Sequence, residues 1–351
     1  MSERLPDLKT ASRERIGWID LLRVLACFLV VFSHCCDPFV AVFDSDRPTF
    51  LYGCFSGSLV RCCVPLFVMM TGVLLLPVRT DTAVFYRKRI GRILLALIFW
   101  SVALPLLYLL YTRIAPETSL DAGNYTWEAT LPKLWNFIFN FTYETTPLWY
   151  LYMLAGLYLV MPVLSAWLER ASRRDLRILL GICDWNEFGT FHYVSGFAGY
   201  LVLAHYLVKF PPAWSWRRTL GVCIPLFAVG YLVTAFGYVL LQKHFPGNYA
   251  YLEIVWYFAG INVFMMTLPV FLVVQKLASR PRAWLARIAG ATFGIYLCHF
   301  VFVQAGYDLI GRIPGLPVPV RIVLNACAAF AVSYGAVWLM QRNRITRRLV
   351  E

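Results

Sequence analysis

The first long apolar run of the chain, residues 18–40, carries four residues that could take part in catalysis: Asp20, Arg23, His34 and Asp37. In a helix, Asp20 and Arg23 are three residues apart, so they share a face and can pair. His34 lies eleven residues beyond Arg23, which is about three turns and about 16 Å along the same face. Asp37 follows one turn later and could orient the imidazole. A histidine held in this way is suited to accept a proton near neutral pH. Arg23 nearer the cytoplasmic side and His34 deeper on the same face could line a cavity.

The same four residues also have a simpler interpretation. Asp20 and Arg23 could reach the membrane surface from the start of a helix, and His34 could cap its outer end. An ionisable residue inside an apolar span is costly, however, and therefore is a candidate functional residue. A second histidine, His299, lies within another apolar run. On its own, His299 is more typical of a packed, hydrogen-bonded helix residue than of a catalyst.

The basic run 86–92 is a second candidate site, because it leads into a further apolar run. Arg89 and Arg92 share a helix face, and near a helix N-terminus they could bind phosphate, with Lys88 beside them. The alternative is that these residues only anchor the helix at the membrane surface. The chain has no Walker A, GxGxxG or GxSxG motif, so an ATP-driven pump or a serine esterase is unsupported.

These residues must be positioned by membrane helices, because the composition excludes a water-soluble protein. Of the 351 residues, 60% are hydrophobic and 15% are charged, and the mean hydropathy is +0.64. Soluble domains carry about 45–50% apolar and about 25% charged residues. Several apolar runs reach about 20 residues, the length that crosses a bilayer as a helix. A β-barrel would show short alternating strands instead. We therefore predict an all-α, polytopic membrane bundle.

Nine apolar runs predict complete membrane helices, at residues 18–40, 53–77, 91–112, 147–168, 190–209, 219–241, 251–275, 287–310 and 319–341. Most of the 32 lysines and arginines lie in alternate connections, which places both termini in the cytoplasm. The net charge of +13 then reflects membrane orientation rather than binding of nucleic acid. Connections 170–177 and 209–218 both count as cytoplasmic, yet too few residues separate them for two full crossings. We therefore predict a truncated or incomplete tenth helix near 176–188.

The ten cysteines lie mostly in or beside apolar runs and show no zinc-type spacing. We expect them to act as small apolar residues, since free cysteine is commonly buried. The vicinal pairs Cys35–Cys36 and Cys62–Cys63 leave redox chemistry or lipid modification open.

Five segments, in order along the chain, resemble the integral-membrane acyltransferase 3 family. Arg23 and His34, preceded by Asp20, are similar to the family's Arg-x10-His helix, and Arg89-x-x-Arg92 is similar to its Arg-x-x-Arg motif. The other three segments are Val64–Gly72 with Thr71 where the family often has serine, Leu148–Tyr152 with Trp149, and Phe293–His299 with Tyr296. Each motif alone is weak, but five in order are specific.

The resemblance runs from about residue 16 to 341 and implies a single membrane domain over 16–341. A basic cytoplasmic head (1–15) and a basic cytoplasmic tail (342–351) would flank this domain, and the family usually has ten helices. Between residues 162 and 199 the chain looks shorter than such relatives, which affects how Asp184, Glu187 and His192 lie. No esterase-like domain follows residue 341, so we expect direct transfer to the acceptor.

The resemblance implies an O-acyltransferase of the bacterial cytoplasmic (inner) membrane, similar to short members that acetylate enterobacterial common antigen. The donor substrate would be acetyl-CoA, no metal would be needed, and the acceptor would be a hydroxyl of an envelope glycan or lipid-linked saccharide. His34 would be the general base, or alternatively the site of a His-acyl intermediate, and Arg23 would hold the donor. Arg89 and Arg92, with Lys88, would bind the acyl-CoA phosphates. Supporting roles would fall to Asp20, Asp37, Thr71, Trp149, Tyr296 and His299.

Two other classes of protein remain open from the sequence. A transporter or flippase for an envelope lipid or a small anion would also have about ten helices and buried charges, although no paired half-repeats are visible. A passive membrane subunit would not need charge inside its first helix. In every case the lipid bilayer is a partner, and no nucleic acid is expected to be one.

Overall fold

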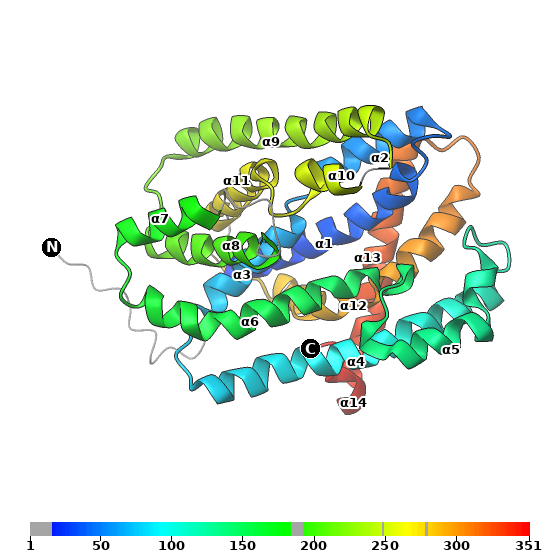
Figure 1. Ribbon diagram of the computed structural model, residues 1–351, viewed down its shortest axis with the longest axis horizontal. Coiled ribbons are helices and arrows are strands. Elements are labelled where there is room, and N and C mark those ends of the chain that lie inside the picture. The colour runs from blue at the N-terminus through cyan, green and yellow to red at the C-terminus, as the bar shows by residue number, and fades with distance from the viewer. Residues whose placement is uncertain (1–15, 184–191, 248, 278–279) are drawn as a thin grey trace.

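The computed structural model describes residues 16–183, 192–247, 249–277 and 280–351, and within these ranges the chain forms helices and no strand (Figure 1). Eight stretches of the described chain are long and apolar enough to cross a membrane. They are Gly17–Val40, Arg47–Leu75, Thr82–Ile114, Trp127–Leu168, Trp216–His244, Ile254–Leu277, Ala283–Gly311 and Val318–Arg342. The prediction of an all-helical, polytopic membrane bundle is therefore confirmed.

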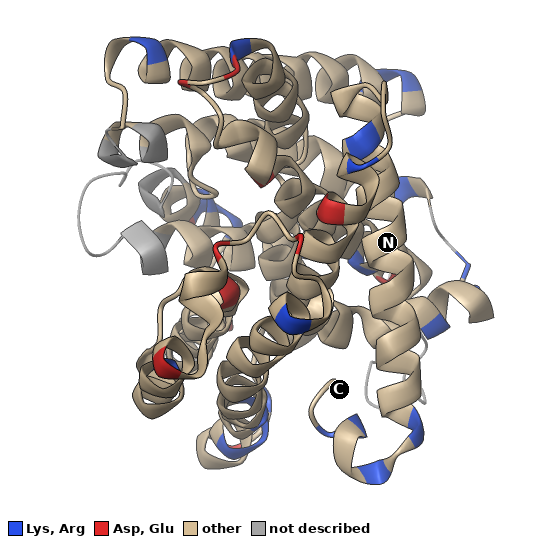
Figure 2. Cartoon of the chain, turned by 90° about the vertical axis from the view of Figure 1, so that its right-hand side faces the viewer, with Lys and Arg blue, Asp and Glu red and all other residues tan. Residues whose placement is uncertain are grey.

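The longer helices, in chain order, are α1 (Gly17–Val40), α2 (Arg47–Leu59), α3 (Cys63–Leu75), α4 (Thr82–Ile114), α5 (Trp127–Asn136), α6 (Trp149–Leu168), α7 (Arg173–Cys183), α8 (His192–Lys209), α9 (Trp216–His244), α10 (Tyr249–Trp256), α11 (Ile261–Leu277), α12 (Ala283–Gly311) and α13 (Val318–Arg342). Four short helices complete the set: η1 (Ala122–Tyr125), η2 (Phe137–Phe139), η3 (Tyr143–Leu148) and α14 (Arg344–Arg347). Charged residues lie mainly at the ends of helices and in connections, and the helix shafts are largely uncharged (Figure 2).

Two predicted spans are broken in the middle, so the expectation of continuous helices at 53–77 and 251–275 is wrong. The first is divided between α2 and α3, where Pro65 occupies the first turn of α3. Proline suits this position but cannot continue a helix from the preceding turn. The second is divided between α10 and α11, where the Asn262 amide donates to the Val255 carbonyl at 2.6 Å. That bond supplies a partner for a carbonyl that the break releases.

The truncated helix predicted near 176–188 overlaps with α7. Residues 184–188 of that prediction lie outside the described ranges. The 11 described residues of α7 extend over about 16 Å, which is less than a bilayer crossing needs. α7 packs along α8, and Arg173 at its start donates to the hydroxyl of Tyr206 near the end of α8 at 3.2 Å. The connections before α7 and after α8 therefore lie at the same end of the bundle. We call this end, where α4 and α9 also begin, the basic end (left in Figure 1).

Helix α1 lies among α2, α3, α11, α12 and α13 and supplies much of the core. Leu22, Ala26, Cys27 and Val31 on α1 are fully buried. Every cysteine whose side chain is described is a free thiol, and all except Cys327 are buried, as expected for small apolar residues. α1 starts at the basic end and finishes at the opposite end, so its polar residues are held at defined depths.

Candidate functional site

The last turns of α1 hold a histidine–carboxylate pair. The His34 Nδ1 lies 2.7 Å from Asp37 Oδ2, and the two side chains are 18% and 46% exposed. A carboxylate accepts hydrogen bonds, so it fixes the proton on Nδ1 and leaves Nε2 with a lone pair. The pair thus presents a basic nitrogen in a partly accessible position, through the contact that the three-residue spacing predicts.

A second histidine lies against this pair. The rings of His34 and His299 have centroids 5.3 Å apart. His299 is fully buried on α12, and its Nδ1 lies 2.6 Å from the Tyr296 carbonyl. That carbonyl requires Nδ1 to be the donor, and the His299 Nε2 has no hydrogen-bond partner among the described residues. His299 is therefore the packed, hydrogen-bonded helix residue that the sequence predicts, and it also lies beside His34.

Aromatic side chains cover the pair, and the sequence did not indicate them. Phe300 lies 5.1 Å from the His34 ring and 5.0 Å from Tyr143, measured between centroids. Tyr143 begins η3, and its hydroxyl donates to Gln304 Oε1 at 3.4 Å. Nothing in a polar connection marks one tyrosine for this place, because Phe300 and Gln304 lie more than 150 residues away in the sequence.

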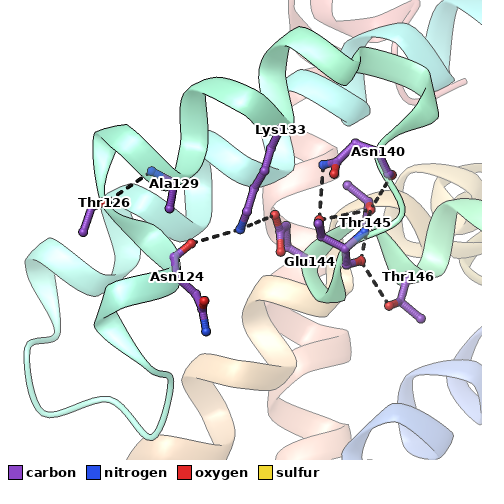
Figure 3. Close-up of polar contacts among 9 residues, drawn as sticks. Asn124, Thr126, Ala129, Lys133, Asn140, Glu144, Thr145 and Thr146 are labelled. Atoms are coloured by element: carbon purple, nitrogen blue, oxygen red, sulfur yellow. Dashed lines mark hydrogen bonds and ion pairs between the residues drawn. The ribbon is translucent and has the colours of Figure 1, made fainter.

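The connection that carries Tyr143 is held by a buried ion pair (Figure 3). Lys133 Nζ lies 2.9 Å from Glu144 Oε1, and the Glu144 side chain is 1% exposed. Lys133 also donates to the Asn124 carbonyl at 3.0 Å. Breaking such a pair leaves an uncompensated buried charge, which is strongly unfavourable. The pair therefore joins α5 to the start of η3, where Tyr143 lies next to Glu144.

A buried arginine, also missed from the sequence, joins the two broken helices. Arg61 lies between α2 and α3, is 8% exposed, and donates through Nε to the Trp256 carbonyl at 2.9 Å. Its guanidinium lies 4.6 Å from the Trp256 ring centroid and 4.0 Å from that of Phe258. Asp37 is close enough to attract the Arg61 cation. The signal available in the sequence was a lone arginine within the predicted span 53–77.

The arginines predicted to bind the donor gather near the basic end. Arg92 on α4 is close enough to Arg89 and to Arg23 on α1 to be repelled by both cations. Tyr158 on α6 interacts electrostatically with Arg89 and Arg92, and Lys88 is exposed. The three arginines thus lie near one another, as binding of an anion would require, and the Glu351 carboxylate is also close enough to attract Arg92.

One part of that expectation is wrong. α4 begins at Thr82, and Asp81 caps it by accepting hydrogen bonds from the amides of Ala83 and Val84 at 2.9 and 3.2 Å. Arg89 and Arg92 therefore lie two to three turns inside the helix, where its amides are already bonded. The helix N-terminus cannot assist in binding an anion there, and the side chains must do so alone.

The remaining candidates lie within the core. Asp20 is 5% exposed in the first turn of α1, and the Thr71 hydroxyl donates to the carbonyl of Phe67 at 3.1 Å. Trp149 stacks on Phe258 with centroids 5.7 Å apart. Tyr296 donates to the Pro147 carbonyl, which ties α12 to the end of η3, just before α6. Asp184 and Glu187 lie outside the described residues, as does the side chain of His192.

The described residues contain no cluster of histidine, cysteine, aspartate or glutamate able to hold a metal ion.

The apolar helical bundle and the histidine–carboxylate pair within it together define a multi-pass membrane protein with a potential catalytic centre. The sequence model of the acyltransferase 3 family, described as an acyltransferase domain, matches residues 16–339. The chain therefore belongs to that family and is a membrane acyltransferase. No curated protein and no solved structure matches it.

Proposed function

We propose that the chain transfers an acetyl group from acetyl-CoA to a hydroxyl of an envelope glycan or lipid-linked saccharide at the bacterial inner membrane. The observation that carries this proposal is the placement of two sites along one helix. Arg23 and His34 both belong to α1, and eleven residues separate them by about 16 Å of helix. A donor with a charged nucleotide and a long flexible arm fits two sites separated in this way.

In this proposal the basic end faces the cytoplasm and binds the donor phosphates through Arg89 and Arg92, with Lys88 at the rim. The pantetheine arm extends past Arg23 into the bundle and brings the thioester to His34. This arrangement brings a donor made in the cytoplasm to an acceptor on the other face of the membrane.

The chemical step follows from the His34–Asp37 pair. His34 Nε2 removes the proton from the acceptor hydroxyl, and the oxygen attacks the thioester carbonyl. The carbon–sulfur bond then breaks, and the thiolate of CoA takes the proton from His34. Asp37 holds the ring in the required tautomer and stabilises the imidazolium while it exists. Atoms and charge balance without a metal or a redox cofactor.

The test is transfer of label from radiolabelled acetyl-CoA to envelope glycan by the purified, detergent-solubilised protein. General-base assistance contributes about 10²–10⁴ in rate, so His34→Ala should lose about that much activity and still bind acetyl-CoA. His244→Ala, which changes a histidine at the end of α9, is the matched control. Normal transfer by His34→Ala would contradict the assignment. Failure of the native protein to bind acetyl-CoA would instead favour transport of a lipid or an anion.

A further inference from the structure

A polar cavity of about 290 Å³ lies at the end of the bundle opposite the basic end. It forms where α12 ends and α13 begins, and the end of α1 and the connection after α4 complete its walls. Phe39 and Tyr307 supply aromatic surface to its lining, and Asp308, Arg321 and Asn325 supply polar groups. None of the catalytic or donor-binding residues proposed above belongs to this lining.

The carboxylate of Asp308 is fixed in place by several donors. It accepts hydrogen bonds from the hydroxyls of Tyr111 at 2.7 Å, Thr118 at 2.5 Å and Ser119 at 2.6 Å. The Ser119 amide adds a fourth bond at 3.1 Å. A carboxylate with this many partners holds its position without a ligand, so this wall of the cavity is preorganised.

The charges of the lining cancel. Arg312 pairs with Glu117 at 3.3 Å, and Arg321 donates through Nε to the carbonyl of Leu316 at 2.8 Å. With Asp308, the cavity thus holds two cations and two carboxylates. A phosphate or diphosphate group would need a net positive site, whereas a neutral, hydroxyl-rich molecule would not.

The aromatic part of the lining suits the face of a sugar ring. Phe39 and Tyr307 lie with ring centroids 5.4 Å apart at 71°. The C–H groups of a pyranose pack against aromatic surface, and its hydroxyls bond to carboxylate, amide and guanidinium groups. A concave site that combines aromatic surface with a few convergent polar groups is a common form of a small-ligand site.

A line of contacts leads from this cavity to the His34–Asp37 pair. Phe39 follows Asp37 by two residues on α1. Tyr143 interacts electrostatically with both Asp37 and Asp308 and donates to Gln304 Oε1 at 3.4 Å. Gln304 Nε2 in turn donates to Asp308 at 3.2 Å. A molecule in the cavity is therefore next to the aromatic cover of the catalytic pair.

We propose that this cavity binds an uncharged saccharide unit of the acyl acceptor and directs one of its hydroxyls toward His34. The inference rests on the proposed acyltransferase function, which it deepens by assigning the acceptor subsite. Tyr307 forms the platform for the ring, and the exposed Arg312 and Glu117 side chains of the lining bind its hydroxyls. The acyl donor is expected to make no contact here.

The experiment measures binding directly, so that it does not depend on turnover. The probe is fluorescently labelled envelope oligosaccharide from which base treatment has removed existing acyl groups, and it is titrated into the purified full-length protein. Tyr307→Ala should raise its Kd about tenfold or more, which corresponds to about 1.4 kcal/mol. Tyr307→Phe keeps the ring and should bind nearly as well as the native protein. Trp135→Ala changes an 88% exposed aromatic residue outside the cavity lining and is the matched control.

Acetyl-CoA binding, measured on the same samples, should be unchanged in all three variants and thus reports that they are folded. Equal binding of the oligosaccharide by Tyr307→Ala and native protein would overturn the proposal. So would absence of binding to the native protein, or displacement of the probe by inorganic phosphate at millimolar concentration. Binding that depends on Tyr307 without any transfer of label would support the cavity and contradict the acyltransferase proposal instead.

Discussion

Asp37 is exposed enough to be solvated, yet it holds the His34 ring through a 2.7 Å contact. Replacing it with asparagine keeps the size of the side chain but removes the charge that stabilises an imidazolium. We expect Asp37→Asn to lower the rate of transfer more than about tenfold, and less than the about 10⁴-fold loss typical of a buried triad aspartate. Acetyl-CoA binding should be unaffected. Asp44→Asn, at an exposed carboxylate just beyond α1, is the control, and equal rates for both variants would exclude the role of Asp37.

A substitution at His299 distinguishes a role in acetyl transfer from a role in packing the core. Its Nε2 is buried without a partner in the described chain, which is unfavourable by about 1–3 kcal/mol. His299→Phe fills a similar volume and removes that polar atom. We expect a protein with equal or higher thermal stability and reduced acetyl transfer, because a hydrogen-bond acceptor next to His34 is lost. A variant that is both less stable and fully active per folded molecule would mean that His299 only packs the core.

At the scale of elements, the two broken helices depend on Arg61. Its guanidinium bonds to the Trp256 carbonyl at the end of α10, where no further helical turn supplies a donor. Arg61→Leu leaves that carbonyl without this donor, and we expect a loss of about 1–3 kcal/mol in stability. Arg61→Lys should not restore it, because an ammonium lacks the planar, forked donors that bond and stack together. Thermal unfolding in detergent measures both.

Arg47→Leu, at an exposed position in the first turn of α2, is the matched control and should unfold at the native temperature. Full stability of Arg61→Lys would show that charge alone suffices at the break. In that case the planar, forked shape of the guanidinium that joins α2–α3 to α10–α11 would not contribute to stability.

The spans could be predicted from the sequence, because hydropathy over about 20 residues is a local property. Their interruptions could not. The break after Trp256 is held by Asn262 and by Arg61, which lies 195 residues away in the sequence. The predicted span began at residue 91, whereas α4 begins at Thr82. Asp81 is a good N-cap, but the first turns of α4 are polar and therefore lie outside the apolar run on which the prediction was based.

In the candidate site, too, local contacts could be predicted from the sequence and long-range contacts could not. The contact between His34 and Asp37 is one helical turn long, so spacing predicts it. The approach of His299, the cover by Tyr143 and the cavity at Asp308 all join segments that are distant in the chain. Such contacts follow from the packing of α1 against α12 and from the Lys133–Glu144 pair, which residue patterns do not specify.

For the molecule as a whole, α1 connects two ends with different chemistry. The arginines gather near the basic end, whereas the His34–Asp37 pair and the neutral cavity lie toward the other end. If the donor enters at one end and the acceptor at the other, substitutions at each end should affect a different substrate. We therefore expect Arg89→Gln and Arg92→Gln to raise the KM for acetyl-CoA about tenfold each, since a charge-assisted hydrogen bond contributes about 1.5–3 kcal/mol.

In both arginine variants the KM for the oligosaccharide should stay at its native value, and kcat at saturating donor should change little. Tyr307→Ala should show the reverse pattern, with a raised KM for the oligosaccharide alone. Arg87→Gln removes an exposed charge from the same basic run and controls for a general effect of surface charge. A matching rise in both KM values in any one variant would place donor and acceptor at the same end, and α1 would then not link two separate substrate sites.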